Sequence, residues 1–274
     1  MVLTGGSSGI GAAAASSLSV RGATVVASYR DAARAERAAA PARALGGKVI
    51  PLQLDLERSA SIRTFAEEVL DLGTRIDVLV HNAGAVYRRE KLTEEGLDAQ
   101  AAVIFYGPLL LTHLLLPRLE ATSRIVDVVS DLHRRARAED LDRPAPYGFL
   151  RSYTLAELRK VLASRELARR LRPRGVDAHC VHPGGVSTRL FRDLGGPLGI
   201  LFALANPLRM RTAAGARGIV HAAAEVPAGA GWSYLVNGRL GVRSGRPSRL
   251  TDDEALAARV YEEGCRRVGV APLA

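Results

Sequence analysis

The stretch that most constrains the fold is the glycine-rich run Thr4-Gly5-Gly6-Ser7-Ser8-Gly9-Ile10-Gly11. It follows the apolar pair Val2-Leu3 and precedes the alanine-rich segment 12–20, so it predicts a tight turn from a strand into a helix. Amide groups at a helix start lack partners within the helix and favour a bound phosphate. The glycine spacing differs from the common Gly-x-Gly-x-x-Gly fingerprint of dinucleotide-binding proteins. We expect a pyrophosphate-binding turn, with an ordinary glycine-rich connection as the alternative.

Apolar runs alternate with helical patterns along the rest of the chain. This alternation predicts an α/β protein of the Rossmann type, a doubly wound parallel sheet with helices on both faces, in which ligands bind at the carboxyl ends of the strands. The 274 residues contain no internal repeat or low-complexity linker, so we expect one dinucleotide-binding domain over residues 1–274. Strands are expected at 2–3, 24–29, 49–54, 76–80, 124–130, 176–181 and 232–236, and helices at 12–20, 32–45, 59–72, 94–119, 152–171, 212–224 and 251–268.

Charge and composition exclude several classes of protein. The net charge is +10, but the basic residues are spread along the chain without a block interleaved with aromatics, so we expect no nucleic-acid partner. No uninterrupted apolar run approaches about 18 residues, which predicts no membrane span. Cys180 and Cys265 lack metal-type spacing, so no disulfide framework or metal site is expected. The glycine turn begins without a basic and apolar leader, and we expect a cytoplasmic protein.

The end of the second predicted strand bears on the choice of cofactor. About 20 residues after such a turn, dinucleotide folds place a carboxylate on the ribose of NAD or an arginine on the 2′-phosphate of NADP. Here Arg30 comes first and Asp31 follows, which favours NADP(H) over NAD(H). The alternatives are that Arg30 is an ordinary surface cation and that Asp31 caps the next helix. Asp55 and Leu56, after the third strand, are expected near the adenine.

Further motifs follow in a characteristic order, namely Asp55, Asn82-Ala83-Gly84, a strand-terminal Ser130, Tyr153 and Pro183-Gly184. Together with the glycine turn they resemble the short-chain dehydrogenase/reductase family over nearly the entire chain. The segments Arg165 to Leu171 and His182-Pro183-Gly184 are similar to its retinol-dehydrogenase-like branch. The resemblance implies a nicotinamide cofactor bound by Gly5, Ser7, Ser8, Gly9, Ile10, Gly11, Arg30, Asp55, Leu56, Asn82, Ala83, Gly84, Pro183, Gly184 and Thr188.

The resemblance also implies a catalytic tetrad of asparagine, serine, tyrosine and lysine. In the family the serine holds the substrate oxygen, the tyrosine exchanges a proton while hydride moves, and the lysine binds the ribose and lowers the pKa of the tyrosine. The asparagine completes a water-linked proton path. Ser130 and Tyr153 fit this pattern, whereas Glu157 stands at the lysine position and Ile104 at the asparagine position.

The replacement at residue 157 reverses a charge. An ionised Glu157 beside the phenol should raise the pKa of Tyr153, which harms alcohol oxidation most and carbonyl reduction less. We therefore expect Ser130, Tyr153 and Glu157 to be the catalytic residues of an atypical site, with Glu157 still able to accept ribose hydroxyls. Lys160, three residues further along the helix, is expected to pair with Glu157.

Two other groups near these motifs are weaker candidates. Tyr147 and Arg151 repeat the tyrosine-to-cation spacing, but they fall beside prolines before the helix and are expected to be loop residues. His133, three residues after Ser130, is a candidate acid or base, although an ordinary loop histidine is the favoured interpretation.

Three functions fit these observations. The first is an NADP(H)-dependent oxidoreductase for a bulky apolar carbonyl or alcohol, since the apolar segment 197–208 lies in the place of the family's substrate lid, around residues 190–212. A membrane-surface or dimer contact is the alternative for that segment. The second is a redox-neutral cyclase, isomerase or dehydratase, and the third is a catalytically silent cofactor-binding protein. The resemblance implies a homodimer or homotetramer through the helices around 100–116 and 153–171.

Overall fold

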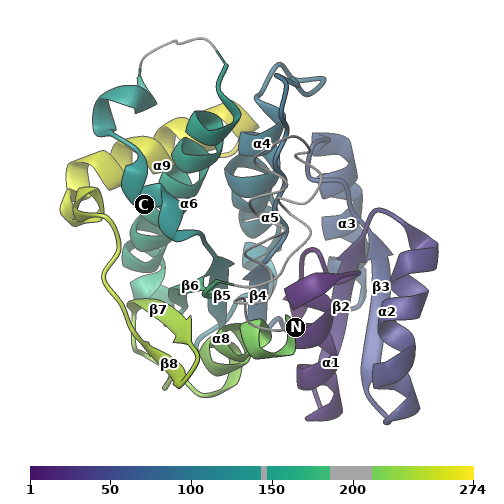
Figure 1. The fold of residues 1–274 in the computed structure, drawn as a ribbon. Coiled ribbons are helices and arrows are strands. Elements are labelled where there is room, and N and C mark those ends of the chain that lie inside the picture. The colour runs from purple at the N-terminus through teal and green to yellow at the C-terminus, as the bar shows by residue number, and fades with distance from the viewer. Residues whose placement is uncertain (143–146, 186–211) are drawn as a thin grey trace.

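The computed structural model describes residues 1–142, 147–185 and 212–274, and its centre is one eight-stranded sheet (Figure 1). The strand order is β3-β2-β1-β4-β5-β6-β7-β8, and all neighbours are parallel except β7 and β8. The predicted doubly wound α/β fold is confirmed. The strands are β1 (Val2–Leu3), β2 (Thr24–Tyr29), β3 (Lys48–Gln53), β4 (Val78–His81), β5 (Arg124–Val128), β6 (Asp177–His182), β7 (Trp232–Gly238) and β8 (Gly241–Ser244).

Helices cover both faces of the sheet because each strand between them is apolar on both sides. One face packs against α1, α2 and α8, and the other against α3, α5 and α6, with α9 lying on α5 and α6 (Figure 1). The helices are α1 (Gly9–Val20), α2 (Ala32–Ala44), α3 (Ser59–Asp71), α4 (Ala99–Ala101), α5 (Gly107–Leu115), α6 (Phe149–Leu171), α8 (Thr212–Ala224) and α9 (Glu254–Val268).

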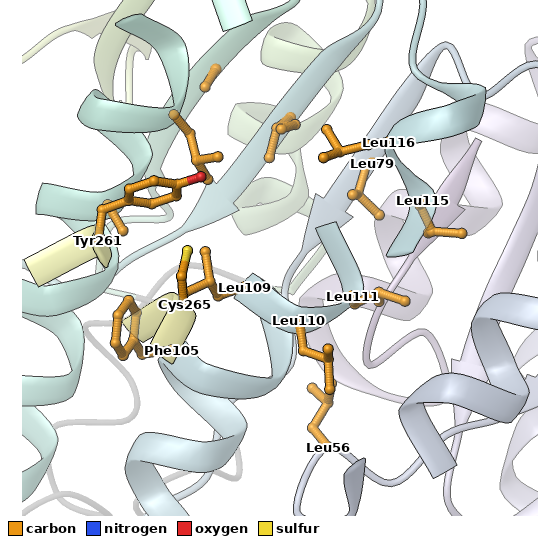
Figure 2. Close-up of a cluster of buried hydrophobic side chains, with 14 of the residues drawn as sticks. Leu56, Leu79, Phe105, Leu109, Leu110, Leu111, Leu115, Leu116, Tyr261 and Cys265 are labelled. Carbon is orange, nitrogen blue, oxygen red and sulfur yellow. The ribbon is translucent and has the colours of Figure 1, made fainter. Parts of the chain in front are cut away.

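The larger apolar core lies on the α5 side of the sheet. Figure 2 shows leucines of α5 between the sheet residue Leu79 and the side chains of Phe105 and Tyr261. Within the described residues, helix 99–118 is the one stretch long and apolar enough to cross a membrane, but 78% of its apolar window is buried inside the fold. That burial is what a core helix of an α/β domain shows.

Several elements differ from the sequence-based expectation. The helix predicted from residue 94 begins at Ala99, where Asp98 caps it by accepting from Ala101 N at 2.9 Å. The last helix begins at Glu254 with Asp253 as its cap, after a separate short turn. The hairpin strand β8 was not predicted, since Gly241–Ser244 is too short and too exposed to give an alternating apolar pattern.

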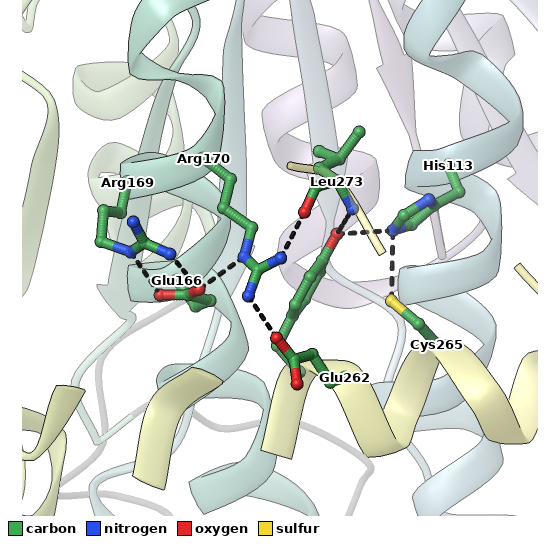
Figure 3. A network of polar contacts seen from close by, with 8 residues as sticks. His113, Glu166, Arg169, Arg170, Glu262, Cys265 and Leu273 are labelled. Atoms are coloured by element: carbon green, nitrogen blue, oxygen red, sulfur yellow. Dashed lines mark hydrogen bonds and ion pairs between the residues drawn. The ribbon is translucent and has the colours of Figure 1, made fainter. Parts of the chain in front are cut away.

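A polar network fixes α9 and the last residues to the body of the fold (Figure 3). Arg170 of α6 donates to Glu166, to Glu262 of α9 and to the Leu273 carbonyl. Tyr261 of α9 lies 3.1 Å from His113 Nε2 on α5 and accepts a hydrogen bond from Leu273 N. Parts of α5 and α6 are therefore covered by their own chain, while the homo-oligomer through these helices stays a prediction.

Candidate active site and cofactor cleft

The candidate cleft lies where the direction of strand addition reverses. β1 and β4 are neighbours at the middle of the sheet, and the chain leaves them toward opposite edges. In open α/β sheets this switch point opens a crevice at the carboxyl ends of the strands. The glycine turn follows β1, and Asn82-Ala83-Gly84 follows β4, so the two predicted cofactor motifs meet at this crevice.

The glycine turn has the shape of a phosphate cradle. Gly5 and Gly9 have φ values of +71° and +58°, a region that other residues rarely adopt. A Cβ atom on Gly11 would lie 2.3 Å from the Gly5 carbonyl oxygen. Ser8, before α1, makes no side-chain capping bond, so the first amides of the helix are not occupied by a capping side chain. These features fit a bound pyrophosphate at Ser7 to Gly11.

Asn82 supports the turn through its side-chain amide. Its Nδ2 donates to the Thr4 and Gly5 carbonyls at 3.0 and 3.2 Å. The buried Thr4 hydroxyl in return accepts from the Asn82 and Ala83 amides. The sequence placed Asn82 in the cofactor group, and the structure assigns it a contact with the phosphate-binding turn itself.

At the adenosine end, Arg30 faces an acid that the sequence analysis missed. Its side chain is 67% exposed, and one nitrogen lies 3.8 Å from Glu57 Oε1. Glu57 is buried and also accepts from Tyr87 and Lys91. Burial alone would raise the pKa of Glu57, but the bonds from Lys91 and Tyr87 lower it below its ordinary value. Lys91 and Tyr87 come from the loop after β4, so no local sequence pattern links them to Glu57.

The other residues expected at the adenosine end make local contacts that order their loops. Asp31 caps α2 by accepting from Arg34 N at 2.9 Å, which confirms the capping alternative for that residue. Asp55 follows β3 and accepts from Glu57 N at 3.1 Å, and Leu56 is buried beside it. The loop after β3 is therefore ordered by its own side chains.

The three predicted catalytic residues converge. Tyr153 and Glu157 lie one turn apart on α6 and are both buried, and Ser130 follows β5. Glu157 Oε2 accepts from Ser130 N at 2.9 Å. The Tyr153 phenol lies within hydrogen-bonding reach of the Ser130 and Glu157 side chains. The carboxylate thus faces the phenol and the serine loop, and the predicted contact of Glu157 with ribose hydroxyls has no support in this arrangement.

The electrostatics of the phenol follow the predicted direction. Burial, and then the Glu157 carboxylate, raise the pKa of Tyr153 well above its ordinary value. Burial also raises the pKa of Glu157, although the nearby Lys160 charge and the bond from Ser130 N oppose this. Tyr153 is therefore fixed as a neutral phenol near pH 7, which suits a proton donor better than a proton acceptor.

Ile104 forms an apolar wall beside the phenol. It is buried in a π-helical turn, Ala102–Tyr106, between α4 and α5, and packs with Tyr153 and Ala156. Single π turns within helices are frequent at functional sites. An isoleucine at this point supplies no hydrogen-bonding group to the site.

Lys160 does not bind Glu157 directly, so the predicted pairing of the two side chains was wrong. Its buried ammonium donates to the His81 carbonyl at 3.0 Å and to the Val128 carbonyl at 2.9 Å. These carbonyls lie at the carboxyl ends of β4 and β5, next to Asn82 and close to Ser130. The Lys160 side chain therefore joins α6 to the ends of these two strands.

The weaker candidates have structural partners. His133 is buried, with Nδ1 2.7 Å from the Ser130 carbonyl, and Nε2 accepts from Ser248 N at 3.0 Å. Both ring nitrogens are thereby occupied, and burial lowers the pKa of His133. Tyr147 donates to the Tyr87 carbonyl at 2.6 Å. His133 connects two loops, and Tyr147 lies before α6 as predicted. Arg151 was also expected in that loop, but it lies in the first turn of α6, where it pairs with Asp140 at 3.0 Å.

The nicotinamide end is described only in part. Pro183 and Gly184 follow β6 at the same edge of the sheet, where Pro183 O accepts from Asn237 Nδ2 at 3.2 Å and Gly184 has a φ of +78°. Thr188, and the lid expected around 190–212 as far as residue 211, lie outside the described residues.

The raised pKa of Glu157 predicts a pH-dependent stability. At pH values between the ordinary pKa of 4.5 and the raised pKa of the folded state, Glu157 is ionised in the unfolded chain but protonated in the folded protein. The free energy of unfolding therefore falls as pH rises through this window. Each unit of difference is worth about 1.4 kcal/mol. Glu157→Gln should therefore gain free energy of unfolding relative to the wild type as pH rises through this window. Urea unfolding from about pH 4 to about pH 8 measures the gain. Glu68→Gln, on the exposed face of α3, is the control, and a pH-independent difference for Glu157→Gln would contradict the assignment.

Comparisons with known proteins agree with the fold and the motifs. Residues 5–225 match the family model described as Enoyl-(Acyl carrier protein) reductase. Dehydrogenase/reductase SDR family member 13 of Bos taurus is 44% identical over 199 residues, which cover 69% of this chain and 52% of the relative. Retinol dehydrogenase 14 of Mus musculus is 38% identical, over 76% of this chain and 66% of the relative. The chain thus spans about half to two thirds of the length of these two relatives.

Solved structures that are similar to this chain agree with this family assignment. A crystal structure of an uncharacterized protein from Mycobacterium paratuberculosis has a TM-score of 0.79 and 32% identity, covering 99% of this chain and 94% of that one. A short-chain dehydrogenase from Burkholderia cenocepacia in complex with NADP has a TM-score of 0.69 and 27% identity, covering 86% and 94%. The chain therefore belongs to the short-chain dehydrogenase/reductase family, in its retinol-dehydrogenase-like branch, and its homologues are oxidoreductases.

Proposed function

We propose that this protein is an NADP(H)-dependent oxidoreductase that reduces a bulky apolar carbonyl compound, with an atypical tetrad in which Glu157 and Ile104 replace lysine and asparagine. The observation that carries the proposal is the convergence of Ser130, Tyr153 and Glu157 at the carboxyl edge of the sheet, the edge at which the glycine turn also lies. Members of this family bind a nicotinamide cofactor with this fold, and a structural neighbour, the short-chain dehydrogenase from Burkholderia cenocepacia, is a complex with NADP. The names of the relatives, retinol dehydrogenases, support a long apolar substrate.

The bound nicotinamide would supply hydride, and the side chains would supply binding and the proton. Ser130 would hold the carbonyl oxygen, and the Tyr153 phenol would donate its proton to that oxygen as the alcohol forms. Because burial and Glu157 keep the phenol protonated, reduction is favoured over alcohol oxidation, which needs a phenolate. The apolar Ile104 wall excludes water beside the phenol.

The proposal is tested by absorbance at the reduced-nicotinamide band. Purified protein with NADPH and an apolar aldehyde such as all-trans-retinal should oxidise the cofactor and form the alcohol. Product formed from a carbonyl or hydroxyl compound without a change in that band would favour the redox-neutral candidate instead. The buried Glu157 carboxyl beside Tyr153 is the observation that favours that second candidate, since it provides an acid next to a fixed phenol. Absence of NADP(H) binding would favour a catalytically silent protein.

Cofactor preference gives a separate prediction at Arg30. Arg30→Ala should weaken NADPH binding by about tenfold or more and leave NADH binding unchanged, because only NADPH carries a 2′-phosphate for the guanidinium. Fluorescence titration with each cofactor measures both affinities. Arg34→Ala is the matched control, since Arg34 is exposed on α2 and pairs with Asp31. Equal affinity of the wild type for the two cofactors would reject the NADP(H) preference.

The cellular location and the assembly state are a further part of the proposal. We infer a cytoplasmic protein, and a homodimer or homotetramer as the family resemblance implies. Since α9 covers parts of α5 and α6, such a contact would have to include α9 or the uncovered surface of those helices. Sedimentation of the purified chain measures its assembly state.

A further inference from the structure

A compact cluster of buried ionisable groups lies beneath the candidate active site. It contains one cation, Lys160, and two carboxylates, Asp127 of β5 and Glu157 of α6. His81 of β4 and Cys180 of β6 complete it, and all five residues are buried. Burial raises the pKa of both carboxylates, and the Lys160 charge opposes this rise. Burial, and then the Lys160 charge, lower the pKa of His81 to about 3. The cation therefore acts on groups of β4, β5 and α6.

The position of the Lys160 ammonium is fixed by the backbone. It donates to the His81 and Val128 carbonyls, at 3.0 and 2.9 Å, so the charge lies at the carboxyl ends of β4 and β5. A buried cation is tolerated only where hydrogen bonds and opposite charge compensate its loss of water. Glu157, three residues before Lys160 on the same helix, supplies such a charge while its Oε2 stays bonded to Ser130 N.

We propose that Lys160 is a positioning residue of this active site, and that Glu157 and Lys160 form one charge-compensated unit on α6. Although no hydrogen bond joins the two side chains, the Lys160 charge favours the ionised Glu157 carboxylate, which accepts from Ser130 N beside the Tyr153 phenol. The role of this unit in catalysis rests on the proposed function, whereas the electrostatic coupling between Glu157 and Lys160 does not depend on it.

The proposal changes what a Glu157→Lys variant should do. A lysine at 157 beside Lys160 would place two buried ammonium groups three residues apart on one helix, where like charges repel. The single substitution should thus destabilise the protein instead of restoring the family's lysine. The double variant Glu157→Lys/Lys160→Met removes the repulsion and should recover at least half of the lost thermal midpoint.

The first experiment is a double-mutant cycle by thermal unfolding near neutral pH, which requires no substrate or cofactor. Lys160→Met should lower the unfolding midpoint by about 6 °C or more in the wild type, and by half of that or less when residue 157 is glutamine. Lys91→Met is the matched control, because Lys91 pairs with Glu57 at the adenosine end, and its effect should add to that of Glu157→Gln. Additive effects of Lys160→Met and Glu157→Gln, or equal midpoints for the Glu157→Lys single and double variants, would overturn the proposal.

The second readout separates positioning from mere structural support. If the protein reduces a carbonyl substrate, the limb of its pH–rate profile that disappears in Glu157→Gln should move to higher pH by one unit or more in Lys160→Met. The groups facing Lys160 in this profile are His81, Asp127, Glu157 and Cys180. A uniform loss of rate without a shift would overturn the positioning role. Coupling in the unfolding cycle together with no turnover of any substrate would instead reject the proposed function and keep the coupling.

Discussion

Tyr153→Phe is expected to lower the rate of carbonyl reduction by about 10²–10⁴-fold, the usual contribution of a positioned general acid. The phenol is buried beside Ser130 and Glu157, so no bulk water replaces it as proton donor. Phenylalanine keeps the ring that packs against Ile104, and the fold should therefore be retained. Stopped-flow or steady-state absorbance at saturating NADPH measures the rate.

Tyr147→Phe is the matched control for this loss. Its hydroxyl donates to the Tyr87 carbonyl in the loop before α6, outside the Ser130 and Glu157 cluster. We expect that variant to retain most of the rate. A general acid usually contributes about 10²-fold or more to the rate. If Tyr153→Phe kept more than about a tenth of the wild-type rate, the loss would be too small for Tyr153 to be the proton donor.

Gly11→Ala is expected to lower both the stability of the protein and its affinity for the cofactor. The added methyl would lie 2.3 Å from the Gly5 carbonyl oxygen, which is backbone, and 2.4 Å from Asn82 Nδ2, which is held by hydrogen bonds to the Thr4 and Gly5 carbonyls. Overpacking of this kind costs about 1–3 kcal/mol of stability. Moving the Gly5 carbonyl also distorts the phosphate cradle, so NADPH affinity should fall by about tenfold or more.

Thermal unfolding and NADPH titration check these two effects of Gly11→Ala. Gly148→Ala is the control, since Gly148 has an extended backbone before α6 and the nearest atom to an added Cβ is 3.7 Å away. Unchanged NADPH affinity in Gly11→Ala would show that the cofactor, if bound, does not use this turn.

Much of the fold was predictable because its signals are local. Strand and helix patterns alternate along the chain, and a turn that must place backbone amides against phosphate needs glycine at Gly5, Gly9 and Gly11. This alternation predicts the doubly wound strand order and the carboxyl edge of the sheet as the place where the motifs lie. Ser130, Tyr153 and Glu157 were assigned to one site by the family resemblance, and local spacing by itself links only Tyr153 and Glu157, four residues apart on one helix.

The partners of the charged residues were decided only by the tertiary structure. Lys160 reaches the His81 carbonyl, 79 positions away in sequence, and Glu57 meets Lys91 across 34 positions. A sequence pattern reports which face of a helix is apolar, but it does not report which backbone acceptors or opposite charges a buried ammonium or carboxylate will find. Those partners depend on how separate elements pack, and in a low-dielectric interior they determine the charge of the site.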